Sequence, residues 1–466
     1  MKLQNQSKFD MLQIHDDAPT IEARRTSSRA QRKALMVVYY FPPLGGGGTQ
    51  RALKFARYLP DYGWQPQVLS VRNSHYLVQD ESLQHELQRD VRITRTPAIL
   101  PGRFMRKVTN YQVNGETSNA NVNGNIISPA LRFLKNAFYT SVYIPDEYIG
   151  WLPFAVAAGK RLCKQDSIDL IFSSGPPNTT HMIAQRLKKS TGLPWVADLR
   201  DLWDQYPDSY NPFQLKARKK LEEYLERKTL QDADGFLVVS EQMRHDLQDK
   251  FPEISAERIS VITNGFDTAD FANLELESDP DYFTVVHAGS LFPWRSLRPF
   301  LQAVKEFFRR SSSAQQRFRL KLLGIIPEQE RSAIANAGLQ ENVIIHDYLP
   351  YRQALSHIVS ADVALLLLGD CGHPANMLTS KLFDYMGARR PILAIGPHGD
   401  LHRLLRQENL GLAFSDEQTS QIAEALHRHF ENWQQGTPMV VNSCYRRFDR
   451  RILTEKLSNV FNTVVA

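Results

Sequence analysis

Lys381 and Asp384 are the charged pair whose spacing indicates binding chemistry most directly. They stand three positions apart in the segment 380–386, where the apolar spacing predicts a helix, so their side chains share one face. A lysine can neutralise a diphosphate, and an aspartate can accept hydrogen bonds from both hydroxyls of a ribose. By composition alone, the pair also fits a surface ion pair.

Four consecutive glycines, Gly45 to Gly48, separate an apolar segment (34–40) from a helical pattern that includes residue 52. Having no side chains, Gly46 and Gly47 let the backbone approach a phosphate or sugar at the start of a helix. The run matches neither GxGxxG nor a P-loop, in which Gly-Lys-Ser/Thr would follow. A flexible turn is the alternative interpretation.

Two later loops also carry polar groups directly after predicted strands. His181 opens a helix, where an imidazole can donate to a sugar hydroxyl or stabilise a developing charge. Asp198, Arg200 and Asp201 bring two carboxylates and a guanidinium to one loop, which is costly unless they are paired or used. The alternatives are a histidine that packs within its domain and an Asp–Arg pair that orders the loop.

The elements that must position these residues alternate between strand and helix along most of the chain. The 466 residues suffice for two domains. Two successive runs of this alternation predict two doubly wound α/β domains with parallel sheets, whose ligands bind at the carboxyl ends of the strands and in the cleft between domains. The predicted boundaries are a disordered tail at 1–32, a first domain at 33–267, an acidic linker at 268–282, a second domain at 283–440 and a C-terminal helical segment at 441–466.

Composition excludes several classes of protein. With 42% apolar and 23% charged residues, the chain is not wholly disordered, and no apolar run approaches the length of a transmembrane helix. A net charge of +6 without a dense basic run argues against a nucleic-acid partner. The polar segment 1–32 does not resemble a signal peptide, and three cysteines far apart form no zinc motif. We therefore expect a cytoplasmic protein.

An anionic membrane surface is a further candidate partner. The segment 129–143 mixes aromatic and leucine side chains with Arg132 and Lys135, and the helix predicted at 216–228 is rich in lysine and arginine. A face of this kind could lie on an anionic bilayer and present a lipid-linked acceptor. Ordinary packing with a solvated charged face is the alternative.

Several ordered motifs resemble family-four retaining glycosyltransferases of the GT-B fold. The segment 380–394 looks like their donor-site signature, and 261–267 resembles their domain-junction signature. Residues 287–291 are similar to the loop that opens their second domain, and the segments 174–181 and 195–203 look like their first domain. The resemblance implies two Rossmann-like domains facing a cleft, with the nucleotide-diphosphate sugar on the second domain, the acceptor on the first and the last helix crossing back to the first.

The resemblance also implies roles for single residues. Asp384 would hold the ribose, Lys381 and Arg295 would face the diphosphate and stabilise the leaving group, and His181 would orient the sugar or support positive charge near the anomeric carbon. Asn376 stands where the family often has a glutamate that touches the donor sugar. The remaining candidates are Gly46, Gly47, Gly289, Ser290, Tyr348 and Leu349 on the donor side and Asp198, Arg200 and Asp201 on the acceptor side.

The function implied is transfer of a hexose, with retention, to a saccharide or lipid-linked acceptor in surface polysaccharide or glycolipid synthesis. The resemblance implies no cofactor or metal, because such enzymes usually need none, and the DxD spelling Asp279-Pro280-Asp281 lies in the predicted linker. We expect the enzyme in the cytoplasm, with association to the inner face of the cell membrane. The alternatives are a nucleotide-sugar epimerase of the same fold and a non-catalytic partner subunit.

Overall fold

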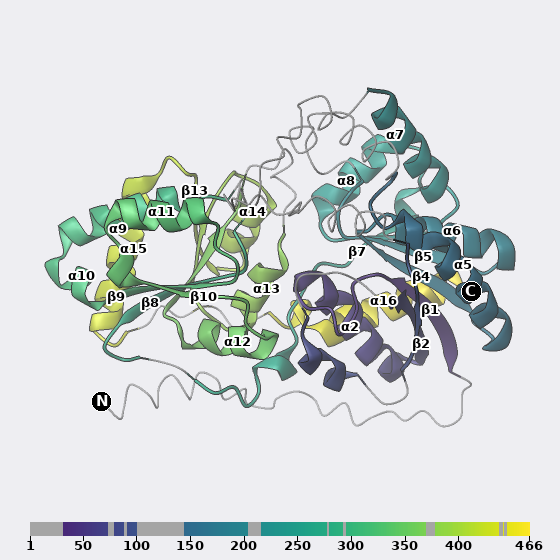
Figure 1. The fold of residues 1–466 in the computed structure, drawn as a ribbon, viewed down its shortest axis with the longest axis horizontal. Coiled ribbons are helices and arrows are strands. Elements are labelled where there is room, and N and C mark those ends of the chain that lie inside the picture. Colours follow the sequence, from purple (N-terminus) through teal and green to yellow (C-terminus); the bar gives the residue numbers. More distant parts are fainter. Residues whose placement is uncertain are drawn as a thin grey trace, which may run out of the picture.

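The computed structural model describes residues 31–72, 79–87, 91–99, 144–203, 216–276, 279–291, 295–369, 378–437, 441 and 445–466. Asn376, the segment 129–143 and all but the last two residues of the predicted tail lie outside the described residues. The described chain forms two α/β lobes, which lie side by side in Figure 1.

The first lobe is built on a seven-stranded parallel sheet with the order β3-β2-β1-β4-β5-β6-β7. Its register aligns Val38 with Ser174 and Ser174 with Asp198, so the loops that follow β1, β4 and β5 leave the same edge of the sheet. The strands are β1 (Arg32–Val38), β2 (Trp64–Val71), β3 (Arg92–Thr96), β4 (Leu170–Gly175), β5 (Trp195–Leu199), β6 (Gly235–Val238) and β7 (Ile259–Val261).

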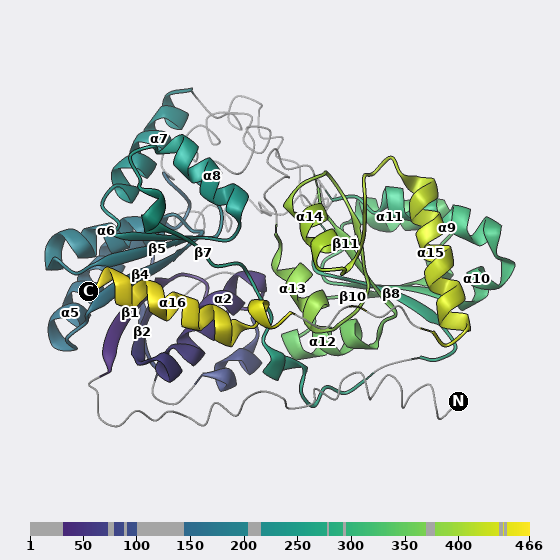
Figure 2. The ribbon, with the colours of Figure 1, turned by 180° about the vertical axis from the view of Figure 1, so that it is seen from behind.

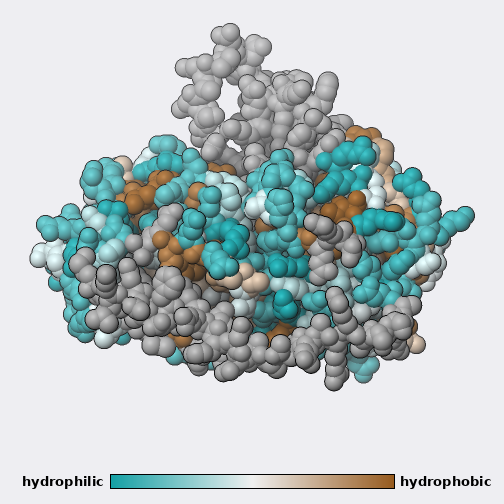
Figure 3. Space-filling model, turned by 90° about the horizontal axis from the view of Figure 1, so that it is seen from below, coloured by the Kyte–Doolittle hydropathy of each residue, from teal (hydrophilic) through white to brown (hydrophobic). Residues whose placement is uncertain are grey.

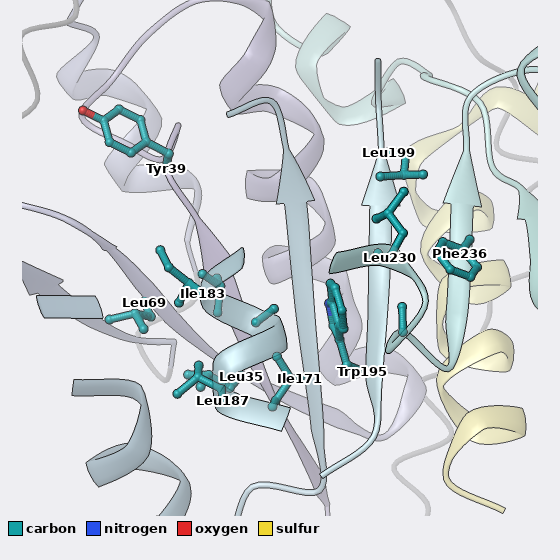
Figure 4. Packing of buried hydrophobic residues seen from close by; sticks show 14 of the residues in the cluster. Leu35, Tyr39, Leu69, Ile171, Ile183, Leu187, Trp195, Leu199, Leu230 and Phe236 are labelled. Atoms are coloured by element: carbon teal, nitrogen blue, oxygen red, sulfur yellow. The ribbon is translucent and has the colours of Figure 1, made fainter. Parts of the chain in front are cut away.

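Helices cover both faces of this sheet because its central strands are apolar on both sides. On one face, Trp195 and Ile171 pack with Ile183 and Leu187 of a covering helix (Figure 4). The other face packs against helices that include the last one of the chain. The helices of this lobe are α2 (Gly47–Tyr58), α5 (Leu152–Gln165), α6 (Thr179–Thr191), α7 (Lys216–Leu230), α8 (Glu241–Lys250) and α16 (Arg450–Val464).

The second lobe has a six-stranded parallel sheet with the order β10-β9-β8-β11-β12-β13. Its two faces carry separate apolar clusters. The strands are β8 (Phe283–Ala288), β9 (Phe318–Leu323), β10 (Val343–His346), β11 (Val363–Leu367), β12 (Ile392–Ile395) and β13 (Gly411–Phe414). The helices are α9 (Arg298–Arg310), α10 (Ser312–Arg317), α11 (Glu328–Ala337), α12 (Tyr351–Ser360), α13 (Ser380–Gly387), α14 (Asp400–Gln407) and α15 (Thr419–Gln434).

The last helix, α16, lies in the first lobe although it follows the second lobe in sequence (Figures 1 and 2). Leu453, Leu457 and Phe461 of α16 join the apolar cluster that contains Phe55 of α2. Short 3₁₀ helices complete the described structure: η1 (Leu59–Tyr62), η2 (Glu81–Glu86), η3 (Ile149–Trp151), η5 (Ala256–Arg258), η6 (Thr268–Phe271), η7 (Gln340–Asn342) and η9 (Arg446–Phe448).

Two parallel sheets covered by helices confirm the predicted fold class. Two elements have too weak a sequence pattern to be predicted: α8, in which only Met243 and Leu247 are buried, and the four-residue strand β13. Within the predicted C-terminal helical segment 441–466, the last helix begins at Arg450, because the carboxylate of Asp449 caps it by accepting from the backbone N–H of Arg451 at 2.8 Å.

None of the helices described here is long and apolar enough to cross a membrane. On the face of the molecule shown in Figure 3, hydrophilic side chains cover most of the described surface, and hydrophobic ones form small separate patches.

Candidate functional site

Lys381 is the most unusual cation of the second lobe. Its Nζ atom is buried and has no hydrogen-bond partner among the residues that the structure describes. The side chain passes directly over Gly289, where an added Cβ would lie 2.1 Å from Cε of the lysine, and the φ angle of +118° there also favours glycine. Burial, and then the charge of Arg295, lower the pKa of Lys381 to about 7. The lobe therefore holds an ammonium group poorly neutralised by its surroundings.

Arg295 and His287 complete a basic cluster around this lysine. Both side chains are buried. Burial and the nearby charges of Lys381 and Arg295 hold the pKa of His287 well below its usual value, so this imidazole is neutral. Lys381 passes over Gly289, which directly follows β8, so this cation lies near the carboxyl end of that strand, where open α/β sheets bind their ligands.

The first turn of α13 adds a helix N-terminus to this cluster. The helix starts at Ser380, and its N-cap residue Thr379 makes no side-chain cap hydrogen bond. Backbone N–H groups at such an end carry partial positive charge and favour phosphate oxygens. Lys381 and the start of α13 thus present complementary features for the same anion.

Asp384 lies one turn further along α13 and faces a second set of partners. Tyr351 donates its hydroxyl to Oδ1 of this carboxylate at 2.8 Å. Burial raises the pKa of Asp384 to about 6, against the effects of the Tyr351 hydrogen bond and of the charges of Arg450, Lys54 and Lys381. The carboxylate is ionised above that pH and can then accept hydrogen bonds from hydroxyl groups.

The glycine loop of the first lobe meets α13 of the second. Gly46 has a φ of 85° and precedes α2, and a Cβ at Gly47 would lie 2.4 Å from Oγ of Ser380. The contact places α2 and α13 next to each other at the junction of the lobes (Figure 2). The structure thus brings the predicted glycine loop and the predicted donor helix together.

Arg200 fastens that glycine loop to the loop after β4. Its guanidinium donates to the carbonyl oxygens of Gly48 at 2.5 Å, Gly175 at 3.0 Å and Pro176 at 2.6 Å. All three partners are backbone oxygens, so these hydrogen bonds of Arg200 are not the Asp–Arg pair of the alternative interpretation. Its position makes it a clamp between two loops at the edge of the first sheet.

His181 sits in the first turn of α6 behind these loops and is 1% exposed. Trp195 donates its indole N–H to Oγ of Ser173 at 2.8 Å, and that hydroxyl lies 2.9 Å from Nδ1 of the histidine. The other ring nitrogen, Nε2, lies next to Gly175. Burial lowers the pKa of His181 to about 4. The imidazole is therefore neutral near pH 7.

Asp198 forms a buried structural ion pair. Arg51 of α2 reaches it with Nε and Nη2, at 3.0 and 2.8 Å, and Ser174 donates to it at 2.7 Å. The same guanidinium donates to the carbonyl oxygens of Ile262 and Thr263. This corresponds to the alternative of a structural pair, although the partner is Arg51. With 0% exposure and both oxygens occupied, Asp198 offers nothing to an acceptor in this state.

The remaining predicted site residues within the described ranges are Asp201, Ser290, Tyr348 and Leu349. Burial raises the pKa of Asp201, opposed by Arg200. Ser290 uses its hydroxyl to accept from the backbone N–H of Ile325 at 3.2 Å. Tyr348 is 37% exposed, and Leu349 packs against the apolar cluster around α13. The Asn376 prediction falls outside the described residues.

Sequence reasoning missed a second set of charged residues, at the junction of the lobes. Lys54 of α2 is 1% exposed and forms ion pairs with Glu86, Asp267 and Asp270. Burial alone would lower the pKa of Lys54, but the three carboxylates raise it above its ordinary value. A lysine among the apolar positions of α2, such as Phe55, was the signal in the sequence, because unpaired lysine is almost never fully buried.

Arg450, the first residue of α16, lies beside this network and is 2% exposed. Burial, together with the charge of Arg51, lowers its pKa to about 10, while Tyr351, Asp384 and Asp267 oppose the shift. The last helix therefore adds a cation near the carboxylate of Asp384.

Within the described ranges, no group of three or more histidine, cysteine, aspartate or glutamate side chains is arranged to hold a metal ion.

Comparison with known proteins defines the class. Solved structures similar over most of the chain include sucrose-phosphate synthase from Thermosynechococcus elongatus, with a TM-score of 0.61, 14% identity and coverage of 93% of this chain and 98% of that chain. Anabaena HepE in complex with UDP-glucose has a TM-score of 0.60 and 14% identity over 92% and 99% of the two chains. No curated relative matches the sequence. The two facing lobes therefore have the GT-B fold.

Residues 130–270 match the model of Glycosyltransferase Family 4. The segment 130–270 of this GT-B chain is therefore similar to family 4 glycosyltransferases.

Proposed function

We propose that this protein transfers a sugar from a nucleotide-diphosphate donor, bound on the second lobe, to an acceptor on the first. The observation that carries the proposal is the buried Nζ of Lys381, which has no hydrogen-bond partner in the described part of the chain and lies near Arg295. Two cations kept together away from water are unfavourable unless an anion joins them. A diphosphate at the start of α13 would supply that anion.

Each residue then has a distinct task. Asp384 accepts from the ribose, while Lys381 and Arg295 stabilise the charge that collects on the diphosphate as the bond to the anomeric carbon breaks. The acceptor oxygen forms the new bond, and its proton passes to the departing phosphate, with retention of configuration. The neutral imidazole of His181 orients the sugar on the first-lobe side.

We propose a uridine nucleotide as the first donor to test. HepE was solved with UDP-glucose and with UDP, and the fold similarity extends over both lobes. A saccharide or a lipid-linked saccharide is the proposed acceptor, as in surface polysaccharide or glycolipid synthesis. The lipopolysaccharide glycosyltransferase WaaG also has a similar fold, with a TM-score of 0.53 and 13% identity over 92% and 99% of the chains.

An epimerase is the second candidate function, because one structure with a similar fold is a putative epimerase. A putative UDP-N-acetylglucosamine 2-epimerase from Listeria monocytogenes has a TM-score of 0.54 and 10% identity over 93% and 96% of the chains. The two activities differ in their need for an acceptor.

Product analysis separates the candidates. The protein is incubated with UDP-glucose and UDP-N-acetylglucosamine, and nucleotide release and sugar configuration are followed by NMR. A transferase releases UDP faster when saccharide or polyprenyl-linked acceptors are added, and the sugar appears on the acceptor. An epimerised sugar formed at the same rate without any acceptor would refute transfer and support the second candidate.

We further propose that α7 contacts an anionic membrane. Leu221 and Tyr224 of this helix are 43% and 56% exposed, and the neighbouring Lys219 and Lys220 are exposed as well. Aromatic and leucine side chains among lysines suit the interface of an anionic bilayer, where each cation contributes about 1 kcal/mol.

Reversing the charge of Lys219 and Lys220 to glutamate should weaken binding to phosphatidylglycerol vesicles in a sedimentation assay. The matched control reverses Lys305 and Arg309, which are exposed on α9 of the second lobe. Equal binding by the α7 variant and the wild type would rule out this surface, as would an equal loss in the α9 variant.

A further inference from the structure

Three hydrogen bonds connect the first lobe with the carboxylate of Asp384. The backbone N–H of Asp80 donates to the carbonyl oxygen of Pro43 at 2.8 Å, in the turn that leads into the glycine loop. The carboxylate Oδ2 of Asp80 accepts from the backbone N–H of Tyr351 at 2.9 Å. The hydroxyl of Tyr351 donates to Oδ1 of Asp384 at 2.8 Å. Because these residues lie far apart in the sequence, no local motif reveals the connection between them.

Asp80 is held firmly on its own side of the junction. It is 4% exposed, and its Oδ1 accepts from the backbone N–H of Ser82 at 3.1 Å, at the start of η2. The neighbouring Gln79 forms an isolated bridge with Leu44, which precedes the glycines. The position of this carboxylate is therefore tied to the position of the glycine loop.

On the other side, Asp80 acts as the cap of a helix in the second lobe. The helix α12 begins at Tyr351, and its own N-cap residue, Pro350, makes no side-chain cap hydrogen bond. A carboxylate at this end satisfies a backbone N–H and interacts favourably with the helix dipole. The cap belongs to the other lobe, so it forms only when the two lobes are together.

We propose that Asp80 and Tyr351 are positioning residues that couple the closed arrangement of the two lobes to the orientation of Asp384 for the donor ribose. The inference rests on the proposed function, because it requires Asp384 to bind a nucleotide. Contact between Asp80 and α12 fixes the first residue of that helix, and its hydroxyl then holds Oδ1 of Asp384. The second oxygen, Oδ2, remains to accept from ribose. The glycine loop thereby helps to set the donor site through Asp80 and Tyr351.

The groups around Asp384 set its pKa. The pH dependence of nucleotide affinity therefore tests the role of Tyr351 separately from any loss of structure. The carboxylate of Asp384 faces Tyr351 from α12, Arg450 from α16, Lys54 from α2 and Lys381 from its own helix. Burial raises its pKa, and the hydrogen bond from Tyr351 is the largest opposing effect. Removing this hydroxyl should raise the pKa further, so the pH below which nucleotide affinity declines should move upward.

The experiment is a calorimetric titration of UDP into the full chain between pH 5 and pH 8. The variants are Asp80→Ala, Asp80→Asn, Tyr351→Phe and the double variant Asp80→Ala/Tyr351→Phe. Asp80→Ala and Tyr351→Phe should each weaken UDP binding about tenfold, the size expected for one hydrogen bond to a charged group. The double variant should resemble Tyr351→Phe alone, because both changes break one connection. Asp80→Asn keeps an acceptor oxygen and should retain most of the affinity.

The matched control is Asp169→Ala. Asp169 also accepts from a backbone N–H, that of Lys33 at 2.7 Å, but at the opposite end of β1. It should leave UDP affinity and its pH profile unchanged. Additive losses in the double variant, or a Tyr351→Phe profile that coincides with the wild type, would overturn the coupling while wild-type binding still supported the proposed function. Wild-type protein that binds neither UDP nor another nucleoside diphosphate would overturn both.

Discussion

Replacing Lys381 with methionine should lower the turnover number about 100- to 1,000-fold, the usual loss when one preorganised group that stabilises transition-state charge is removed. Methionine keeps the length and most of the packing of the side chain over Gly289, so the change removes mainly the charge. Affinity for the donor should fall far less, because the diphosphate gains its additional negative charge only as the bond to the sugar breaks.

The pH dependence gives this prediction a second measurement. Burial and Arg295 lower the pKa of Lys381 to about 7, so the free protein loses the charge of this ammonium as the pH rises through that value. Nucleotide affinity should decline over the same range in the wild type and stay flat in Lys381→Met. The control Lys305→Met changes an exposed lysine of α9. A variant with wild-type turnover at saturating donor would remove Lys381 from the mechanism.

Replacing Lys54 with methionine should lower the free energy of unfolding by about 3–5 kcal/mol, the loss expected when one partner of a buried ion pair is removed. The variant leaves the carboxylates of Asp267, Asp270 and Glu86 close together without the ammonium that they share. Burial and the neighbouring carboxylates already raise the pKa of Asp270 in the presence of the lysine.

Urea denaturation of the purified variants measures this effect. The combined variant Lys54→Met/Asp270→Asn removes one negative charge and should recover part of the lost stability. The control Lys188→Met breaks an ion pair with Asp234 in which both side chains are partly exposed, and such pairs contribute roughly 0–1 kcal/mol. An equal loss in Lys54→Met and Lys188→Met would show that the junction network does not stabilise the fold.

The fold class could be predicted because parallel sheets give a strong local signal. Buried strands such as β1 and β11 are continuous apolar runs, and glycine- or proline-containing loops separate them from amphipathic helices. Elements with few buried residues gave no such signal, as α8 shows. The first part of the predicted linker forms η6, whose Asp270 is buried only because Lys54 lies across from it.

Only those parts of the candidate site that lie within one short segment could be predicted from the sequence. Lys381, Asp384 and the glycine loop were found from their own neighbours in sequence. Their actual partners come from far away in the chain: Tyr351 for Asp384, Arg51 for Asp198, and backbone oxygens for Arg200. Such pairings depend on how the two lobes and the last helix pack, which no local spacing encodes.

The direct test of the donor site is a calorimetric titration of UDP into the wild type and into Asp384→Ala at pH 6.5, where Asp384 and Lys381 are both largely charged. The account predicts saturable binding by the wild type and at least about tenfold weaker binding by the variant, which loses charged hydrogen bonds to the ribose. Equal affinity in the two proteins, or no binding of UDP, GDP or ADP by the wild type, would contradict it.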